Sequence, residues 1–253
     1  MQVDIEIADS IATITLNEPA TRNALHDEAL VEIHEHLDSA AAAEDVTTVV
    51  IRGASRAFTS GGSMTSLLEL AELRRGPDGA EIVAQRTRQN SSLVERILAQ
   101  PQLTVALISG PVAGAGLGIA GACDLRFAVP EAKFVPGFGS LGLTTDLGAL
   151  AMVRRAIGDA AANSWFISGE IWSADVARER GYLDGVLTEA DALARITKLS
   201  GRLTPDDRHR IARQRSLSFA AAALAAELDR EADAFTESID AEFAQLRIRA
   251  AQR

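Results

Sequence analysis

The chain has 253 residues, with 25 Lys and Arg against 35 Asp and Glu, and a formal net charge of −10. This length suffices for one large α/β domain, or for one domain with an appendage. The acidic balance argues against a nucleic-acid-binding protein, which normally carries a basic patch. It still allows a polyanionic small ligand held at a local positive site.

Two features of the sequence indicate the compartment. Cys123 is the single cysteine, so an internal disulfide is excluded and a reducing environment fits best. The opening residues MQVDIEIADS alternate like a strand and do not form a basic-then-apolar leader. We therefore expect a cytoplasmic protein.

The first hundred residues predict strands and helices in alternation. Residues 2–7 and 11–16 alternate about Asp9-Ser10, which predicts a β-hairpin. Helical periodicity and one apolar run then predict a helix, a buried strand and two further helices, at residues 27–43, 46–53, 64–73 and 80–99.

The rest of the chain continues this alternation and ends in helices. Strands are predicted at 103–109 and 125–129, followed by helices at 147–157, 159–167, 174–180 and 189–200. Such an order predicts a largely parallel α/β arrangement. In the C-terminal segment, apolar residues recur at mostly helical spacing: Leu224, Leu228, Phe235, Ile239, Phe243 and Leu246. They predict a helix that packs either on its own domain or on a partner subunit.

Residues 103–123 contain no charged residue and are long enough to cross a bilayer. However, Gly110-Pro111 interrupts this stretch near its middle, and its second half is rich in glycine. A strand, a turn and a short helix are therefore expected there, and no membrane span.

The same stretch contains Gly116-x-Gly118-x-x-Gly121, the spacing of a dinucleotide-binding fingerprint. That fingerprint begins directly after a strand and is followed by an acidic residue about 20 positions later. Here Gly116 lies seven residues beyond Ser109, and the nearest acid, Glu131, lies only ten residues past Gly121. The pattern therefore does not predict NAD binding.

Two glycine-rich turns, 57–64 and 109–121, each leave a predicted strand and enter a predicted helix. Glycine permits a close backbone approach, and the first N–H groups of a helix have no partner within it. Two such turns side by side could direct two N–H donors at one oxygen, as in an oxyanion hole. Alternatively, the turns only let strand and helix pack closely.

Four ordered segments decide between these interpretations. They are NEPATRNAL (17–25), VVIRGASRAFTSGGSM (49–64), PQLTVALISGPVAGAGLGIAGACDLRFA (101–128) and ISGEIWSADVARERGYLDGVL (167–187). Each resembles a characteristic segment of the enoyl-CoA hydratase/isomerase (crotonase) family, in the family's order and at compatible separations.

The resemblance implies an α/β fold, a spiral of ββα repeats with a C-terminal α-helical region. Residues 1–200 would form the acyl-CoA-binding core, and residues 201–253 a helical region for oligomerisation or for covering the active site. It also implies a homotrimer or a dimer of trimers, a coenzyme A thioester as substrate and no separate cofactor. With no His, Cys and carboxylate cluster at ligand spacing, no metal is expected.

By the same resemblance, the two oxyanion amides belong to Gly62 and Ala115. The family's acyl-CoA contacts fall on Arg22, Ala24, Ser60, Gly62, Ser63, Met64 and Ala115. Arg22 is the cationic candidate for a phosphate, with a solvated surface arginine as the alternative. Ser63 replaces the family's Asp and is expected to cap the following helix. Ala115 replaces a glycine, so its methyl group is expected to crowd the second donor.

Two departures from the family pattern bear on the reaction. Hydratases of the family use two glutamates to place and activate water. Those positions correspond to Gly118 and Phe138 here, and neither side chain can carry a proton. We therefore do not expect ordinary hydratase activity. No histidine lies between residues 63 and 108, which weighs against the family's dehalogenase branch.

One acid remains well placed, in GLTTDLGA (142–149). This segment resembles the one in which enoyl-CoA isomerases carry their base, which would make Asp146 the catalytic base. The alternative is that Asp146 only caps the next helix. An isomerase-type enzyme is therefore one hypothesis, and a non-catalytic acyl-CoA carrier of the same fold is the other. A hydratase with atypical acid and base residues is a further alternative.

Overall fold

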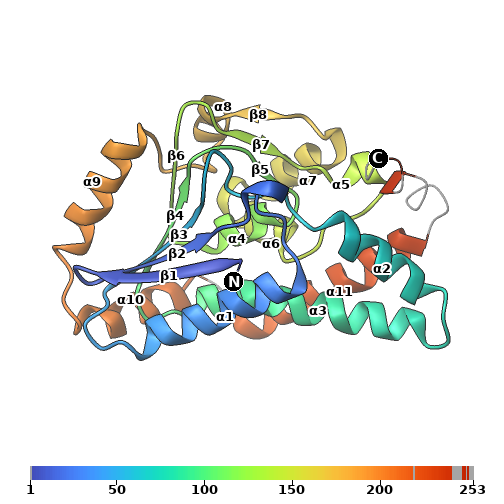
Figure 1. Cartoon of the computed structure of the whole chain (residues 1–253), viewed down its shortest axis with the longest axis horizontal. Helices are drawn as coiled ribbons and strands as arrows, with labels where there is room; N and C mark the ends of the chain where they lie inside the picture. The colour runs from blue at the N-terminus through green and yellow to red at the C-terminus, as the bar shows by residue number, and fades with distance from the viewer. Residues whose placement is uncertain (1, 219, 241–246, 249, 251–253) are drawn as a thin grey trace.

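A computed structural model describes residues 2–218, 220–240, 247–248 and 250, and shows a mixed α/β fold with two sheets (Figure 1). The larger sheet has the strand order β1-β2-β3-β4-β6-β9. Its strands are β1 (Val3–Ala8), β2 (Ile11–Leu16), β3 (Thr48–Gly53), β4 (Leu103–Ile108), β6 (Leu125–Ala128) and β9 (Gly185–Val186). Only β1 runs antiparallel to its neighbour within these described strands, which confirms the predicted parallel arrangement.

The predicted hairpin is formed by β1 and β2, with Ala8 paired to Ile11. The two residues of its turn, Asp9 and Ser10, have φ values of 49° and 64°. A two-residue turn with both residues in this left-handed region matches the twist of the flanking strands.

The smaller sheet has the order β5-β7-β8, formed by β5 (Val112–Ala113), β7 (Lys133–Val135) and β8 (Trp172–Ser173). From β4 to β7 the chain crosses repeatedly between the two sheets, because β4 and β6 belong to the larger one and β5 and β7 to the smaller. This alternation is consistent with the expected spiral of repeats.

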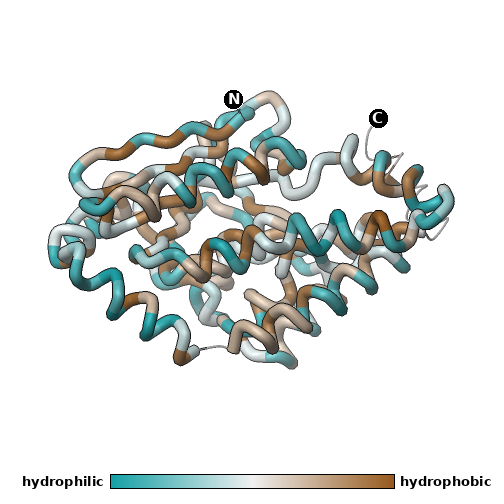
Figure 2. Tube along the Cα trace, turned by 90° about the horizontal axis from the view of Figure 1, so that it is seen from below, coloured by the Kyte–Doolittle hydropathy of each residue, from teal (hydrophilic) through white to brown (hydrophobic). Residues whose placement is uncertain are grey.

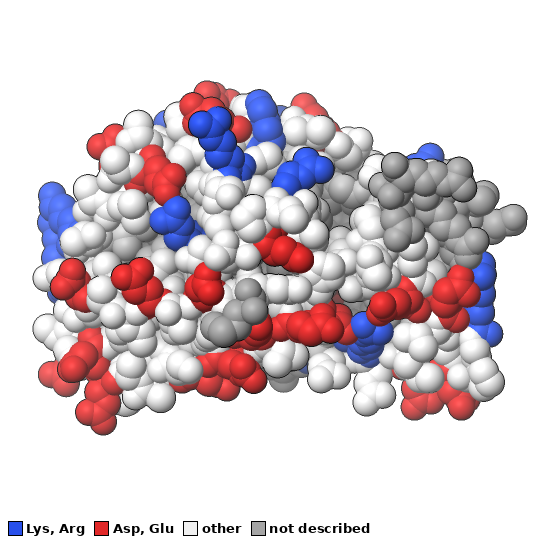
Figure 3. All heavy atoms as spheres, viewed as in Figure 1, with Lys and Arg blue, Asp and Glu red and all other residues white. Residues whose placement is uncertain are grey.

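Helices surround the sheets. They are η1 (Pro19–Thr21), α1 (Asp27–Ala42), α2 (Met64–Arg74), α3 (Gly79–Leu98), α4 (Gly116–Ala122), α5 (Phe138–Leu141), α6 (Ala149–Ile157), α7 (Asp159–Ser168), α8 (Ala174–Glu179), α9 (Glu189–Ser200), α10 (Asp207–Ser216) and α11 (Ala221–Asp240). In Figure 1, α1, α3 and α11 run along the lower side of the molecule. Figure 2 views that side, where hydrophilic and hydrophobic residues alternate along the helices. Acidic side chains gather over the lower half of the face in Figure 3.

The uncharged stretch 103–123 forms β4, β5 and α4, which confirms the predicted strand, turn and short helix. Among the described residues, no helix is both long enough and apolar enough to span a membrane.

The C-terminal helix α11 packs on its own chain, against α3, α2 and α6. Its apolar residues Leu224, Leu228, Phe235 and Ile239 are each no more than 5 % exposed. Phe243 and Leu246, which were predicted to continue this pattern, lie outside the described residues. Packing on its own domain is therefore the alternative that the structure supports, and a role in oligomerisation stays a prediction.

Candidate active site

The two glycine-rich turns lie in direct contact. The Phe58 N–H donates to the Pro111 carbonyl at 3.0 Å, and the Ala113 N–H donates to the Thr59 carbonyl at 3.1 Å. Gly61 has a φ of 87°, and a Cβ at that position would lie 2.9 Å from the carbonyl oxygen of Ala113. Glycine is therefore required where the turns meet, because a side chain would be both strained and too close.

Gly62 and Ala115, the predicted oxyanion pair, line one cavity of about 270 Å³. Within the described part of the chain, neither amide N–H donates to a backbone or side-chain acceptor. A Cβ built on Gly62 meets no atom within 4 Å, so this residue borders open space. Ala115 is 3 % exposed, and it directly precedes α4. Two donors without protein partners therefore border the same cavity, and crowding by the Ala115 methyl group stays a prediction.

Apolar side chains form most of the wall of this cavity. They come from α2, α5, the turn after α5 and α11: Met64, Leu67, Phe138, Leu141, Leu143 and Phe235. An apolar wall with a few polar groups is typical of a pocket for a small ligand. The contribution of α11 to this wall was not predicted from the sequence, because α11 lies far along the chain from the other residues of the site.

Asp146 lines the same cavity, from the turn between α5 and α6. Its Oδ1 is shielded from solvent and has no hydrogen-bond partner among the described residues. Burial, and next the negative charge of Glu231, raise the pKa of the Asp146 carboxyl to about 7. Near neutral pH this carboxyl can therefore both accept and donate a proton.

The alternative interpretation of Asp146, as the cap of α6, is wrong. The N-cap of α6 is Gly148, and no side chain of its own segment caps the helix. The carboxylate of Glu231 on α11 takes this place, accepting from the Gly148 N–H at 2.7 Å and from the Leu150 N–H at 3.3 Å. Glu231 was not predictable from the sequence, because it lies far along the chain and belongs to no local motif.

The two positions that correspond to hydratase glutamates are filled by other groups. A Cβ at Gly118 would lie 2.2 Å from the carbonyl oxygen of Leu147, so the turn that follows Asp146 occupies this space. Phe138 is 8 % exposed and lines the cavity, with its ring next to Gly114 and near Phe166.

The segment around Arg22 is bound to the first glycine-rich turn. The Ser60 N–H donates to the Arg22 carbonyl at 2.9 Å, and Leu25 forms a bridge with Gly62. Arg22 and Ser60 are exposed, and Ala24 is partly buried. The predicted acyl-CoA contacts therefore gather along one rim, although of this group only Ser60, Gly62, Met64 and Ala115 line the cavity itself.

Two polar side chains hold this rim in place. Ser63 is 3 % exposed, and its hydroxyl accepts from the Ser66 N–H at 3.4 Å at the start of α2, which confirms the predicted cap. Asn23 is 2 % exposed and accepts from the Glu18 N–H at 2.9 Å. Its amide donates to the Ala57 carbonyl at 3.0 Å. Asn23 was not predicted as a structural residue of the rim, since a buried asparagine has no distinctive spacing in the sequence.

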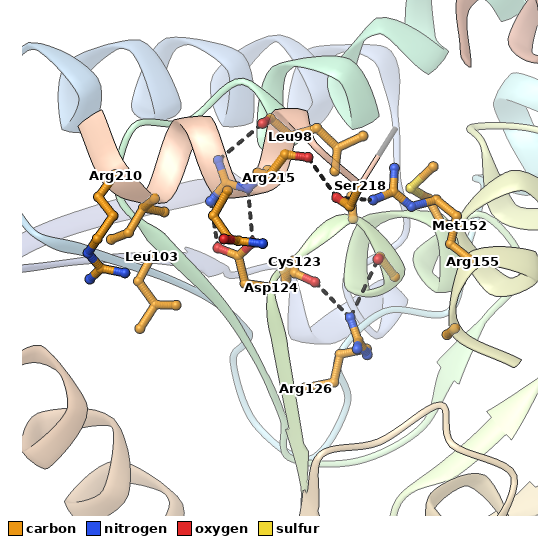
Figure 4. Close-up of a pocket in the computed structure, with 15 residues that line it drawn as sticks. Leu98, Leu103, Cys123, Asp124, Arg126, Met152, Arg155, Arg210, Arg215 and Ser218 are labelled. Carbon is orange, nitrogen blue, oxygen red and sulfur yellow. Dashed lines mark hydrogen bonds and ion pairs between the residues drawn. The ribbon is translucent and has the colours of Figure 1, made fainter. Parts of the chain in front are cut away.

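A larger cavity, of about 460 Å³, lies between α4, β6, α6 and α10 (Figure 4). Arg215 on α10 pairs with Asp124 and donates to three backbone carbonyls, those of Leu98, Gln100 and Gln102. Arg126 donates to the Cys123 and Tyr182 carbonyls. These guanidinium groups are thus already bound to protein acceptors, and the network ties α10 to the core rather than forming the candidate site.

The chain belongs to the enoyl-CoA hydratase/isomerase family, whose model matches residues 6–248. It is 28 % identical to 4-chlorobenzoyl coenzyme A dehalogenase-1 of Arthrobacter sp over 82 % of this chain and 74 % of that protein. It is 30 % identical to trans-2-decenoyl-[acyl-carrier-protein] isomerase of Streptococcus mutans over 76 % of this chain and 71 % of that protein. The crystal structure of enoyl-CoA hydratase from Bacillus halodurans has the same fold, with a TM-score of 0.87 at 24 % identity over 99 % of this chain and 100 % of that one.

Proposed function

We propose that this protein binds an acyl-CoA thioester and shifts a double bond from the 3-enoyl to the 2-enoyl position. One observation carries the proposal: a single cavity contains two amide donors that have no acceptor among the described residues, and one carboxyl of raised pKa. These groups are the ones that enolate chemistry requires, and the reaction needs neither a separate cofactor nor a bound water.

The reaction can be written with these groups alone. The thioester oxygen accepts hydrogen bonds from the Gly62 and Ala115 amides. Ionised Asp146 removes a proton from carbon 2, and the electron pair of the broken C–H bond spreads onto the thioester oxygen as a dienolate. Protonated Asp146 then returns the proton to carbon 4, and the double bond is left between carbons 2 and 3. A base with a pKa of about 7 is suited to both transfers at neutral pH.

The hydratase alternative is weaker because the hydration of a 2-enoyl thioester needs acid and base groups that hold a water. Gly118 and Phe138 cannot supply them, and the close Leu147 carbonyl leaves no room for a side chain at position 118. The relative that is a trans-2-decenoyl-[acyl-carrier-protein] isomerase also supports isomerisation. The relative that is a 4-chlorobenzoyl-CoA dehalogenase supports a coenzyme A thioester as ligand. None of the four histidines is among the described residues that line the cavity.

The coenzyme A part is proposed to lie along the rim formed by Arg22, Ala24, Ser60, Ser63 and Met64. Exposed Arg22 is the proposed phosphate contact, and the backbone bonds between residues 22–25 and 60–63 support a shared surface. As in the family, the assembly is proposed to be a homotrimer or a dimer of trimers.

Asp146→Asn tests the proposal, because it keeps the size of the side chain and removes the base. With 3-enoyl-CoA as substrate, the wild type should accumulate the conjugated product, measured by its ultraviolet absorbance. The variant should be slower by roughly 10²-fold, the lower end for a general base. Tight acyl-CoA binding without turnover by the wild type would instead identify a carrier. Equal rates for the two proteins would exclude Asp146 as the base.

A further inference from the structure

The carboxylate of Glu231 binds the turn that carries Asp146, and we propose that Glu231 is a positioning residue acting through Asp146. In this role it fixes the turn and places a second carboxylate beside the base. The inference rests on the proposed function, in which Asp146 moves the proton. It assigns to the C-terminal helix a part in catalysis besides covering the cavity.

Glu231 accepts hydrogen bonds from both sides of Asp146 in the sequence. The Thr145 hydroxyl donates to it at 2.7 Å, the Gly148 N–H at 2.7 Å and the Leu150 N–H at 3.3 Å. Carboxylates bound by several donors in this way make charge-assisted hydrogen bonds, which are stronger than neutral ones. The turn between α5 and α6 is therefore anchored by a side chain of α11.

The backbone of this turn needs such an anchor. Leu147, directly after Asp146, has a φ of 50°, and Gly148 has a φ of 68°. A leucine rarely adopts the left-handed region, so surrounding contacts must hold it there. The turn is also pressed against Gly118, where the Leu147 carbonyl leaves no space for a side chain.

Glu231 and Asp146 border different cavities. Asp146 lines the cavity of the two amides, whereas Glu231 lines a neighbouring one of about 260 Å³. The charged groups that line the second cavity with Glu231 are Glu227 and Arg230 on α11, and Arg154 on α6. Arg154 is bound to Asp159 at 2.8 Å and lies 4.0 Å from Glu227. Glu231 therefore holds the turn from behind while Asp146 faces the substrate space.

A second carboxylate beside Asp146 makes the ionised form of Asp146 less favourable and thus makes it a stronger base. The pKa of Asp146 is raised by burial first and by the charge of Glu231 second. Removing that charge should shift the acid limb of the pH–rate profile to lower pH and lower the plateau. Loss of the turn geometry alone would lower the rate at the plateau of this profile and leave the pH of its acid limb unchanged.

Glu231→Gln is the decisive variant, with Asp233→Asn as its matched control. Asp233 lies on the same helix and is exposed, so the control removes one negative charge away from the turn. The Asp146 carboxyl is followed by carbon-13 NMR in aspartate-labelled protein and assigned by its absence in Asp146→Asn. Its titration midpoint should lie near pH 7 in the wild type and in Asp233→Asn, and at lower pH in Glu231→Gln. This readout needs no enzymatic activity.

The rate measurement adds the catalytic part. In Glu231→Gln, kcat/KM for 3-enoyl-CoA above pH 8 should fall roughly 10-fold or more, since a weaker base transfers protons more slowly. Its acid limb should move with the NMR midpoint. If Glu231→Gln does not fold by circular dichroism, Glu231→Asp is used, which keeps the charge and shortens the reach. It should lower the plateau without moving the limb.

The outcomes separate the two proposals. An unchanged Asp146 midpoint in folded Glu231→Gln, or a moved limb in Glu231→Asp, overturns the role of Glu231 even if the protein is an isomerase. A lowered midpoint in a protein that never converts 3-enoyl-CoA upholds the coupling of the two carboxyls and refutes the proposed function.

Discussion

Asp146→Asn is expected to change how stability depends on pH, independently of any substrate. In the folded protein the pKa of Asp146 is raised from 3.8 to about 7, mainly by burial. The folded state therefore holds this proton more tightly than the unfolded state does. The associated stabilisation is complete below pH 4, and it is lost as pH rises toward 7. Asparagine has no such proton, so the variant lacks this dependence.

The size of the effect follows from the two pKa values. Each pH unit between them changes the free energy of unfolding by up to about 1.36 kcal/mol. Over the whole interval from 3.8 to about 7 this gives at most roughly 4 kcal/mol, and less because the Asp146 side chain is only partly buried from solvent. From pH 5.5 to pH 8.5, the free energy of unfolding of Asp146→Asn should increase by up to roughly 2 kcal/mol relative to that of the wild type.

Urea denaturation of both proteins at pH 5.5, 6.5, 7.5 and 8.5 measures this difference, with circular dichroism as the signal. Asp233→Asn is the control, because it removes an exposed carboxylate of α11. Its difference from the wild type should stay nearly constant over this range. If the difference in free energy of unfolding between Asp146→Asn and the wild type is also constant from pH 5.5 to 8.5, the pKa of the Asp146 carboxyl is not raised. The argument for a base with a pKa near neutrality then fails.

Three further predictions concern the rest of the site and the fold. Hydration of short and medium 2-enoyl-CoA should be negligible, because the side chains of Gly118 and Phe138 cannot place or activate a water. The assay measures the loss of the conjugated absorbance, and turnover at tens per second would contradict the prediction. Gly62→Pro removes one proposed donor and should abolish binding of a non-reactive acyl-CoA in calorimetry. Gly62→Ala keeps the N–H and has room for its Cβ, so it should still bind. Equal affinities of the two variants would place the thioester elsewhere. Arg215→Met leaves Asp124 without its buried partner and should lower the free energy of unfolding by about 3–5 kcal/mol. The control Arg213→Met changes an exposed residue of the same helix and should lower it by less than about 0.5 kcal/mol. Equal losses would refute the structural role of the network.

Elements with a long repeating pattern were predictable from the sequence. Helices α1 and α3 and strand β2 each carry an apolar periodicity over six residues or more, and the structure places them within a few residues of the expectation. The strands β5, β8 and β9 have two residues each, which is too short for any pattern. Their positions depend on pairing with strands that are distant in the sequence.

The same distinction applies to the site. The Ser63 cap is local, because the hydroxyl and the amide that it binds are three residues apart, and it was predicted. Gly62 and Ala115 came from the family resemblance, and the structure brings them into one cavity. The surroundings of Asp146 could not be derived, because Glu231 reaches the turn from a helix more than 80 residues later.

The arrangement around Asp146 is unfavourable for stability, and this bears on the choice between an enzyme and a carrier. A carrier needs the Gly62 and Ala115 amides, but it gains nothing from a carboxyl whose Oδ1 is shielded and has no hydrogen-bond partner among the described residues. A neutral residue at position 146 would avoid both the burial of a charge and the repulsion by Glu231. Groups whose pKa is raised by burial and by a like charge, at a cavity that also holds free amide donors, are typical of proton transfer in active sites. The energetic disadvantage of Asp146 therefore favours the isomerase over the carrier, and the Asp146→Asn pair of measurements, stability and rate, tests both sides of this trade-off in one variant.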